Sequence, residues 1–195
     1  MSQYPPAGQP LYYDTPPKRR PTSVTVIAVL AIIFGSIWTL MSLCSIPQWL
    51  GVNFMPNPVM DDMRKDTVLV TYTLGSMLLG LVLYIMELWG GIGALSLKPS
   101  ARRTLKVYAW GRIGLSVLEI VFSLALMERT KALTARTLAA NPKLNTPQMQ
   151  QLTEMGYYFG FALSILSFIW PVLVLIYMNK PHVKAAFEEG RAYSQ

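Results

Sequence analysis

Charged residues are scarce in this sequence. They make up 14% of its 195 residues, whereas a soluble domain usually carries about 25%. Hydrophobic residues make up 52%, and they gather in four long blocks. Blocks of about 20 apolar residues are typical of helices that cross a bilayer, and a soluble core does not need them. The composition therefore excludes an ordinary soluble domain and indicates an integral membrane protein.

Cysteine and histidine each occur once, as Cys44 and His182. A single cysteine excludes an intramolecular disulfide. A single histidine, placed near the C-terminus, leaves the serines of the apolar blocks without a histidine base. The HExxH, CxxC, GxSxG and P-loop spacings do not occur either. The sequence therefore predicts no catalytic, cofactor-binding or metal-binding residue, and we expect a protein that is not an enzyme and has no cofactor.

The predicted fold is all-α: an integral membrane four-helix bundle with a disordered N-terminal tail. The spans are expected at about residues 22–44, 67–97, 104–127 and 156–178. Six prolines in residues 1–21 forbid a helix there and predict a disordered tail rich in proline and tyrosine. Residues 179–195 are expected to form a short polar tail that is helical in part.

Prolines set the expected ends and bends of the spans. Pro99 is expected to end the second span and to open a basic turn before the third. Pro171 lies inside the fourth span, where it should kink the helix and deprive the Ser167 carbonyl of its usual partner. Good helix formers at residues 128–140 and 147–155 predict that the third and fourth helices continue beyond the membrane.

The loop at residues 45–66 contains three prolines, and we expect it to be irregular. Its acidic residues could attract a cation, but they alternate with basic ones, which favours an ordinary solvated loop. These residues are Asp61, Asp62, Arg64, Lys65 and Asp66.

Basic residues are unevenly distributed between the predicted loops. Lys18, Arg19 and Arg20 directly precede the first span. Ten basic residues fall on the segments assigned to one side of the membrane and six on the other. By the positive-inside rule, both termini are expected in the cytoplasm. The net charge of +7 then fits loops beside anionic lipid, so we expect the lipid bilayer and no nucleic acid as a partner.

Charged residues inside the predicted spans are the most informative for function. Glu87, Arg112 and Glu119 are each costly in hydrocarbon, about 2.5–3.5 kcal/mol for a charged side chain on insertion scales. With Ser116 they predict an intramembrane polar seam between the second and third spans. If the connecting turn centres on Ser100, Glu87 and Arg112 differ in depth by only about 1.5 Å. This spacing predicts an ion pair between Glu87 and Arg112.

The polar seam has three interpretations. It can be structural, orienting two helices in the bundle. It can line a polar cavity for an ion, a proton or a small ligand. It can also bind another subunit. The sequence favours the structural interpretation and leaves the other two open.

Small residues recur at steps of four in the first and fourth spans. Gly156, Gly160 and Ser164 are candidate helix-packing residues in the fourth span, and Ala31 and Gly35 share a face of the first. Such spacing lets helices approach closely. Within one chain it favours packing of the bundle itself, with homodimerisation as the alternative.

Two stretches carry a family resemblance: KRRPTSVTVIAVLAIIFGS and GGIGALSLKPSARRTLKVYAWGRIGL. In both, the chain resembles small uncharacterised four-span bacterial inner-membrane proteins. The resemblance covers about the first 120 residues. It implies a four-span fold in a bacterial plasma membrane, and it implies no activity and no functional residues.

Two functions follow from these features as hypotheses. The leading one is a non-enzymatic multi-pass membrane protein that acts by helix–helix association, as an accessory subunit or a homo-oligomer. The alternative is a small transport or ligand-binding membrane protein that uses the polar seam. The alternative requires a cavity at mid-membrane, and a dry, fully paired seam would contradict it.

Overall fold

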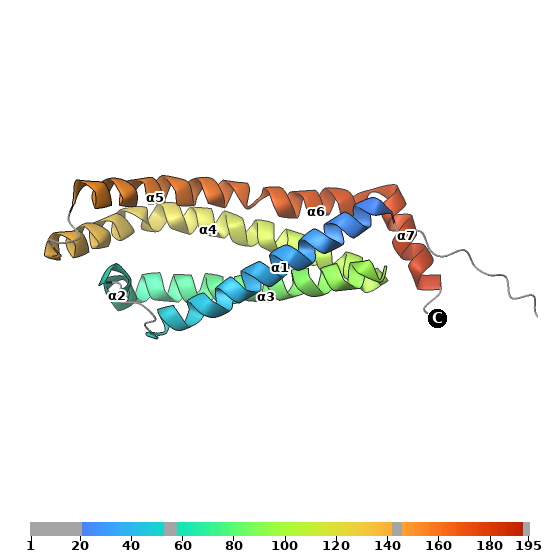
Figure 1. Cartoon of the computed structure of the whole chain (residues 1–195), viewed down its shortest axis with the longest axis horizontal. Coiled ribbons are helices and arrows are strands. Elements are labelled where there is room, and N and C mark those ends of the chain that lie inside the picture. The colour runs from blue at the N-terminus through green and yellow to red at the C-terminus, as the bar shows by residue number, and fades with distance from the viewer. Residues whose placement is uncertain (1–20, 53–57, 142–145, 193–195) are drawn as a thin grey trace, which may run out of the picture.

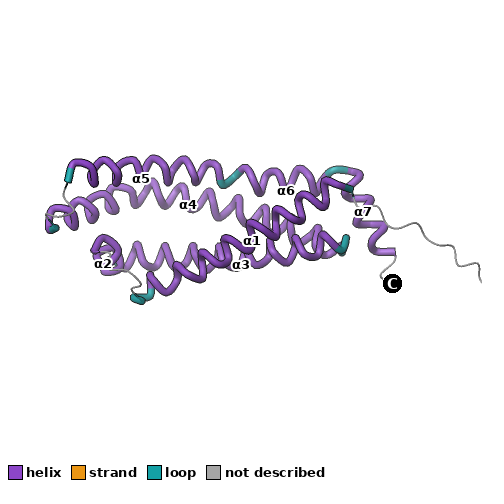
Figure 2. Tube along the Cα trace, in the orientation of Figure 1, coloured by secondary structure: helices purple, strands orange, loops and turns teal. Residues whose placement is uncertain are grey.

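The computed structural model describes residues 21–52, 58–141 and 146–192. The prediction of a disordered tail at residues 1–21 therefore lies almost wholly outside the described residues. In the described part, the chain is helical (Figures 1 and 2). Four stretches are long and apolar enough to cross a membrane: Thr22–Trp49, Thr67–Leu95, Pro99–Ala140 and Gln150–Asn179. The predicted all-helical, multi-pass membrane fold is confirmed.

The helices run in the order α1 (Thr22–Trp49), α2 (Pro58–Lys65), α3 (Thr67–Leu95), α4 (Pro99–Ala140), α5 (Pro147–Leu166), α6 (Ile169–Asn179) and α7 (Pro181–Ala192). Helix α1 packs along α3, α3 along α4, and α4 along α6 (Figure 1). None of the described side chains of α5 is buried, although its Tyr157 hydroxyl lies 3.0 Å from the Thr134 hydroxyl of α4. The core therefore lies among α1, α3, α4 and α6, and α7 closes one end of it.

Glycine lets α1 and α3 approach closely. A Cβ atom added to Gly35 of α1 would lie 2.9 Å from the Leu88 backbone nitrogen of α3. One added to Gly91 of α3 would lie 3.0 Å from the Ala28 carbonyl oxygen and 3.1 Å from Ala31 Cβ. The small-residue face predicted for the first span is thus used within this bundle, as is usual for such faces.

The α3–α4 turn differs from the sequence expectation. Leu97 adopts the left-handed conformation with φ 51°, and the Lys98 N–H donates to the Gly93 carbonyl at 3.1 Å. This is a Schellman ending, in which a left-handed residue satisfies the last carbonyls of a helix. Pro99 then begins α4; the expectation that Pro99 ends the preceding helix was wrong. A first-turn proline is favourable because its missing N–H would have no partner there.

The fourth span is interrupted where Pro171 predicts a kink. Helix α5 ends at Leu166 and α6 begins at Ile169, and Figure 2 shows the break as a loop segment. Proline has no N–H to bond to the carbonyl four residues earlier, and that residue is Ser167. At the same point, the Ser167 hydroxyl donates to the Ser164 carbonyl at 2.7 Å. The break therefore follows from the chemistry of proline, which lacks the N–H needed to continue the helical hydrogen bonds.

Two segments predicted as loop or tail contain helices. The loop after the first span includes α2, so it is not irregular throughout. The C-terminal tail forms α7, whose Val183, Ala186 and Phe187 are buried in the core. An apolar residue at every third or fourth position gives α7 this inward face. As their composition predicts, α4 and α5 extend through residues 128–140 and 147–155.

The close α1–α3 contact predicts opposite effects for two glycine-to-alanine changes. Gly35→Ala forces a methyl group against the α3 backbone and should cost about 1–3 kcal/mol of stability. Gly75→Ala is the matched control, because nothing lies within 4 Å of its Cβ direction. It should be neutral or stabilising by up to about 1 kcal/mol through helix propensity. Thermal unfolding in detergent measures both, and equal midpoints would contradict the close contact.

Candidate functional site

Glu87 is the point where four helices meet. It lies on α3 and is fully buried, with 0% of its surface exposed. The Trp170 indole N–H of α6 donates to Glu87 Oε1, and the Tyr108 phenol of α4 lies beside the carboxyl group. The Trp170 ring makes an edge contact with Phe34 of α1, at 5.0 Å between centroids. Aromatic side chains with polar tips therefore surround the carboxyl group.

The second carboxyl oxygen, Glu87 Oε2, has no hydrogen-bond partner among the described residues. The ion pair predicted between Glu87 and Arg112 is absent from the described contacts: Arg112 Nη1 donates to Glu119 Oε1 at 3.2 Å. That prediction was wrong, and the position of the turn explains the error. With Leu97 as the turn centre, Glu87 lies ten residues before it and Arg112 fifteen after it. At about 1.5 Å per residue, their depths differ by about 7.5 Å.

Neighbouring contacts follow the register set by Leu97. A Cβ on Gly93 would meet Ala101 at 2.8 Å, and one on Gly111 would meet Leu83 at 2.8 Å. Each pair is equidistant from Leu97 along the chain. The residue equidistant with Glu87 is Val107, next to Tyr108, which is why the phenol and not the guanidinium reaches the carboxyl group.

Arg112 and Glu119 form a second polar layer, farther from the turn. They lie two turns apart on one face of α4, and their side chains are 12% and 27% exposed. The Arg112 guanidinium also lies over the Tyr84 ring, 5.6 Å from its centroid. This contact places a cation on an aromatic face, a favourable arrangement where water is scarce.

Ser116 connects α4 to the break in the fourth span. Its hydroxyl is buried and lies 3.3 Å from the Ser167 hydroxyl. The structure thus brings Arg112, Ser116 and Glu119 together on α4, while Glu87 belongs to a separate cluster one layer away. The sequence reasoning missed Trp170. An indole N–H inside a span needs an acceptor, and Glu87 was the available one.

A cavity of about 410 Å³ opens beside the Arg112–Glu119 pair. Its walls come from α1, α3, α4, α5 and α6, and they are mostly aromatic or aliphatic. The lining includes Phe34, Trp38, Tyr84, Tyr108, Leu163, Leu166, Ser167 and Trp170, besides Arg112, Glu119 and Ser164. A mainly apolar wall with a few convergent polar groups is typical of a small-molecule site.

A second cavity of about 410 Å³ adjoins the first at Ser164 and lies between α5 and the α3–α4 hairpin. Gly156, Gly160 and Ser164, the predicted helix-packing residues, line it. Nothing lies within 4 Å of a Cβ added to either glycine. Unlike the glycine of α1, these glycines do not bring α5 into close contact with another described helix.

Helix α2 and the start of α3 border the second cavity through Met63 and Leu69.

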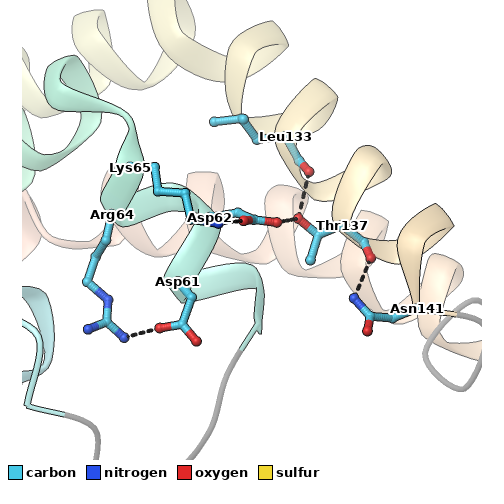
Figure 3. A network of polar contacts seen from close by, with 7 residues as sticks. All are labelled: Asp61, Asp62, Arg64, Lys65, Leu133, Thr137 and Asn141. Carbon is cyan, nitrogen blue, oxygen red and sulfur yellow. Dashed lines mark hydrogen bonds and ion pairs between the residues drawn. The ribbon is translucent and has the colours of Figure 1, made fainter.

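The acidic residues of α2 and of the start of α3 are paired, as Figure 3 shows for α2. Asp61 binds Arg64 at 2.5 Å. Asp62 binds Lys65 at 2.6 Å and accepts a 2.8 Å hydrogen bond from the Thr137 hydroxyl of α4. The predicted solvated loop is therefore a helix tied to α4.

Asp66 is the side-chain cap of α3. Its Oδ1 accepts from the backbone N–H groups of Val68 at 3.1 Å and Leu69 at 3.3 Å, and its Oδ2 accepts from Arg129 of α4. Burial raises the pKa of Asp66, but the Arg129 contact and the two N–H bonds outweigh it. The pKa therefore lies below its usual 3.8.

No group of three or more metal-binding side chains occurs among the described residues. Cys44 is exposed and unpaired.

Comparison of the chain with family models, with curated proteins and with solved structures finds no match.

The two polar layers predict different energetic couplings. In thermal unfolding in detergent, Arg112→Gln and Glu119→Gln should be coupled by about 1 kcal/mol or more, because the two side chains bind each other. Arg112→Gln and Glu87→Gln should be coupled more weakly than this pair, since their side chains do not bind each other and interact only through their charges. A stronger coupling of Arg112 to Glu87 than to Glu119 would contradict the register set by Leu97.

The depressed pKa of Asp66 predicts an acid-sensitive start of α3. The ionised carboxyl group stabilises the folded state, so its contribution is full above the usual pKa of 3.8 and is lost as the pH falls below it. Hydrogen exchange of the Val68 and Leu69 amides should accelerate in acid relative to other amides of α3. In Asp66→Asn, a cap without a titrating group, the same two amides should lose this dependence. Identical profiles in both proteins would exclude Asp66 as its source.

Proposed function

We propose that this chain is a non-enzymatic, multi-pass membrane protein that binds a small amphipathic molecule in the crevice formed by the two adjoining cavities. One observation carries the proposal: the Arg112–Glu119 pair, inside a membrane-spanning helix, lines a cavity of about 410 Å³. Intramembrane charges commonly mark ligand pathways when they face a cavity instead of a fully packed seam.

The shape and chemistry of the crevice support an amphipathic ligand. Each cavity falls in the usual size range of small-molecule sites, roughly 300–1,000 Å³. The cavity at Arg112 offers guanidinium donors and a carboxylate acceptor, and its aromatic walls suit an apolar body. Beyond Ser164 the second cavity is lined mainly by apolar side chains. A molecule with one polar group and an apolar extension matches both parts.

A second candidate function is helix–helix association through α5, as an accessory subunit or a homo-oligomer. The observation that favours it is that no described side chain of α5 is buried, although Gly156 and Gly160 leave room for a close neighbour. The small-residue face of α1 no longer supports association with another chain, because α3 occupies it. The ligand-binding function is therefore the better supported of the two.

The location belongs to the same proposal. We infer a bacterial plasma (inner) membrane with both termini in the cytoplasm. The support is the excess of basic residues before α1, around the α3–α4 turn and in α7, together with the resemblance of the first 120 residues to small bacterial inner-membrane proteins.

The crevice predicts that the purified protein carries a specific amphiphile. Ser164→Trp should displace it, because Ser164 lines both cavities and indole would fill the space between them. Gly114→Trp is the control, since Gly114 is exposed on α4 with nothing within 4 Å of its Cβ direction. Mass spectrometry of organic extracts should find the same species in the parent and the control, and little in Ser164→Trp.

Light scattering of the same three proteins in detergent separates the two candidate functions. Identical extracts from all three proteins, with the composition of the bulk membrane lipid, would overturn the ligand-binding function. If Ser164→Trp changes the oligomeric state while the extract stays the same, association through α5 replaces it.

A further inference from the structure

Basic side chains gather at the end of the bundle where α7 lies. Arg102 and Lys106 belong to the first two turns of α4, and Lys184 belongs to α7. Arg102 Nε donates to the Met178 carbonyl at 3.0 Å, and Lys106 Nζ donates to Asn179 Oδ1. These bonds fix the two α4 cations against the junction of α6 and α7.

Among the described side chains, no carboxylate forms an ion pair with Arg102 or Lys106. Lys106 is close enough to Arg102 and Lys184 to be repelled by both. The described carboxylate near these three is Glu188, which pairs only with Lys184, at 3.8 Å. The remaining described acidic side chains lie inside the spans or on α2, at the start of α3, and on the far parts of α4 and α5. An anion placed among the three cations would relieve their repulsion.

An apolar surface continues from the cluster toward the middle of the bundle. Trp110 lies one turn after Lys106 on the same face of α4, and it is 66% exposed. Ile176 and Val172 lie one and two turns before Asn179 on α6, and they are 51% and 41% exposed. Because Lys106 binds Asn179, these two stripes lie side by side along the α4–α6 contact.

We propose that this surface binds an anionic phospholipid, with its phosphate held by Arg102, Lys106 and Lys184 and its acyl chains along Trp110, Ile176 and Val172. Basic groups at the membrane end of neighbouring helices are suited to anionic headgroups. A tryptophan at this depth has an apolar body for the chains and an indole N–H for the interface. The site is separate from the crevice and does not depend on its occupation.

The test uses the full chain in detergent, titrated with phosphatidylglycerol or phosphatidylcholine and followed by native mass spectrometry. Phosphatidylglycerol should be retained preferentially. Each basic residue near an anionic headgroup contributes roughly fivefold in affinity, so Lys106→Gln with Lys184→Gln should weaken retention about thirtyfold. The matched control, Lys131→Gln with Arg136→Gln, removes the same charge from the far part of α4 and should have no effect.

Two further variants keep the result interpretable. If the double variant unfolds, Lys184→Gln alone removes an exposed amine and should still weaken retention about fivefold. Trp110→Ala should also lower retention, whereas Trp89→Ala, which removes a 75% exposed tryptophan from α3, should not.

Inorganic phosphate distinguishes a lipid site from a free-phosphate site. It should fail to displace phosphatidylglycerol at equal concentration, since it lacks the acyl chains. Displacement by phosphate would overturn the assignment to a lipid. Equal retention of the two lipids, or equal losses in the variants and their controls, would overturn the site itself.

Discussion

The register of the α3–α4 hairpin is the constraint on which the rest of the structure depends, and Leu97 sets it. A leucine in the left-handed conformation costs about 1–2 kcal/mol, yet this side chain is only 2% exposed and packs in the core. Its burial offsets the strain and fixes the turn at one residue. That position puts Tyr108 beside Glu87, and it places Arg112 about 7.5 Å deeper than Glu87. A turn three residues later would have created a different polar interior.

The crevice lies beside a second backbone feature, the break before Pro171. Helix α6 continues the packing against α4, whereas α5, beyond the break, buries no described side chain. The Ser167 hydroxyl meets Ser116 at this point, so the fourth span contacts α4 at the break, and beyond it the Tyr157 hydroxyl of α5 lies 3.0 Å from the Thr134 hydroxyl of α4. One of the adjoining cavities lies along α5, and the other is lined by residues on both sides of the break. A proline that lacks one N–H thus lies where the fourth span changes from α5, with no described side chain buried, to α6, which is buried in part.

Much of the fold could be predicted from composition, because long apolar blocks and proline positions act locally. The four long helices, the extension of α4 to Ala140 and the break near Pro171 are examples. The partners of the polar seam could not be predicted, since they depend on register, and register depended on whether Pro99 ends one helix or begins the next. The packing role of the glycines could not be predicted from the sequence either. Spacing indicated close packing for Gly35 and Gly160 alike, but only tertiary structure shows that Gly35 meets a backbone and Gly160 a cavity.

The sequence predicts one polar seam, but the structure has two polar layers, one around Glu87 and one formed by Arg112 and Glu119. Glu87 is sealed by Trp170, Tyr108 and the helices around it, so a ligand in the crevice meets Trp170 and Tyr108 before it meets the carboxyl group. Its energetic role is to draw α3, α4 and α6 together, because a buried carboxyl group without these donors would be strongly destabilising. Arg112 and Glu119 are paired with each other but open to a cavity. Under the proposed ligand-binding function, such a pair can exchange one contact for a contact with the ligand, so the proposal assigns recognition to this layer and structural support to Glu87.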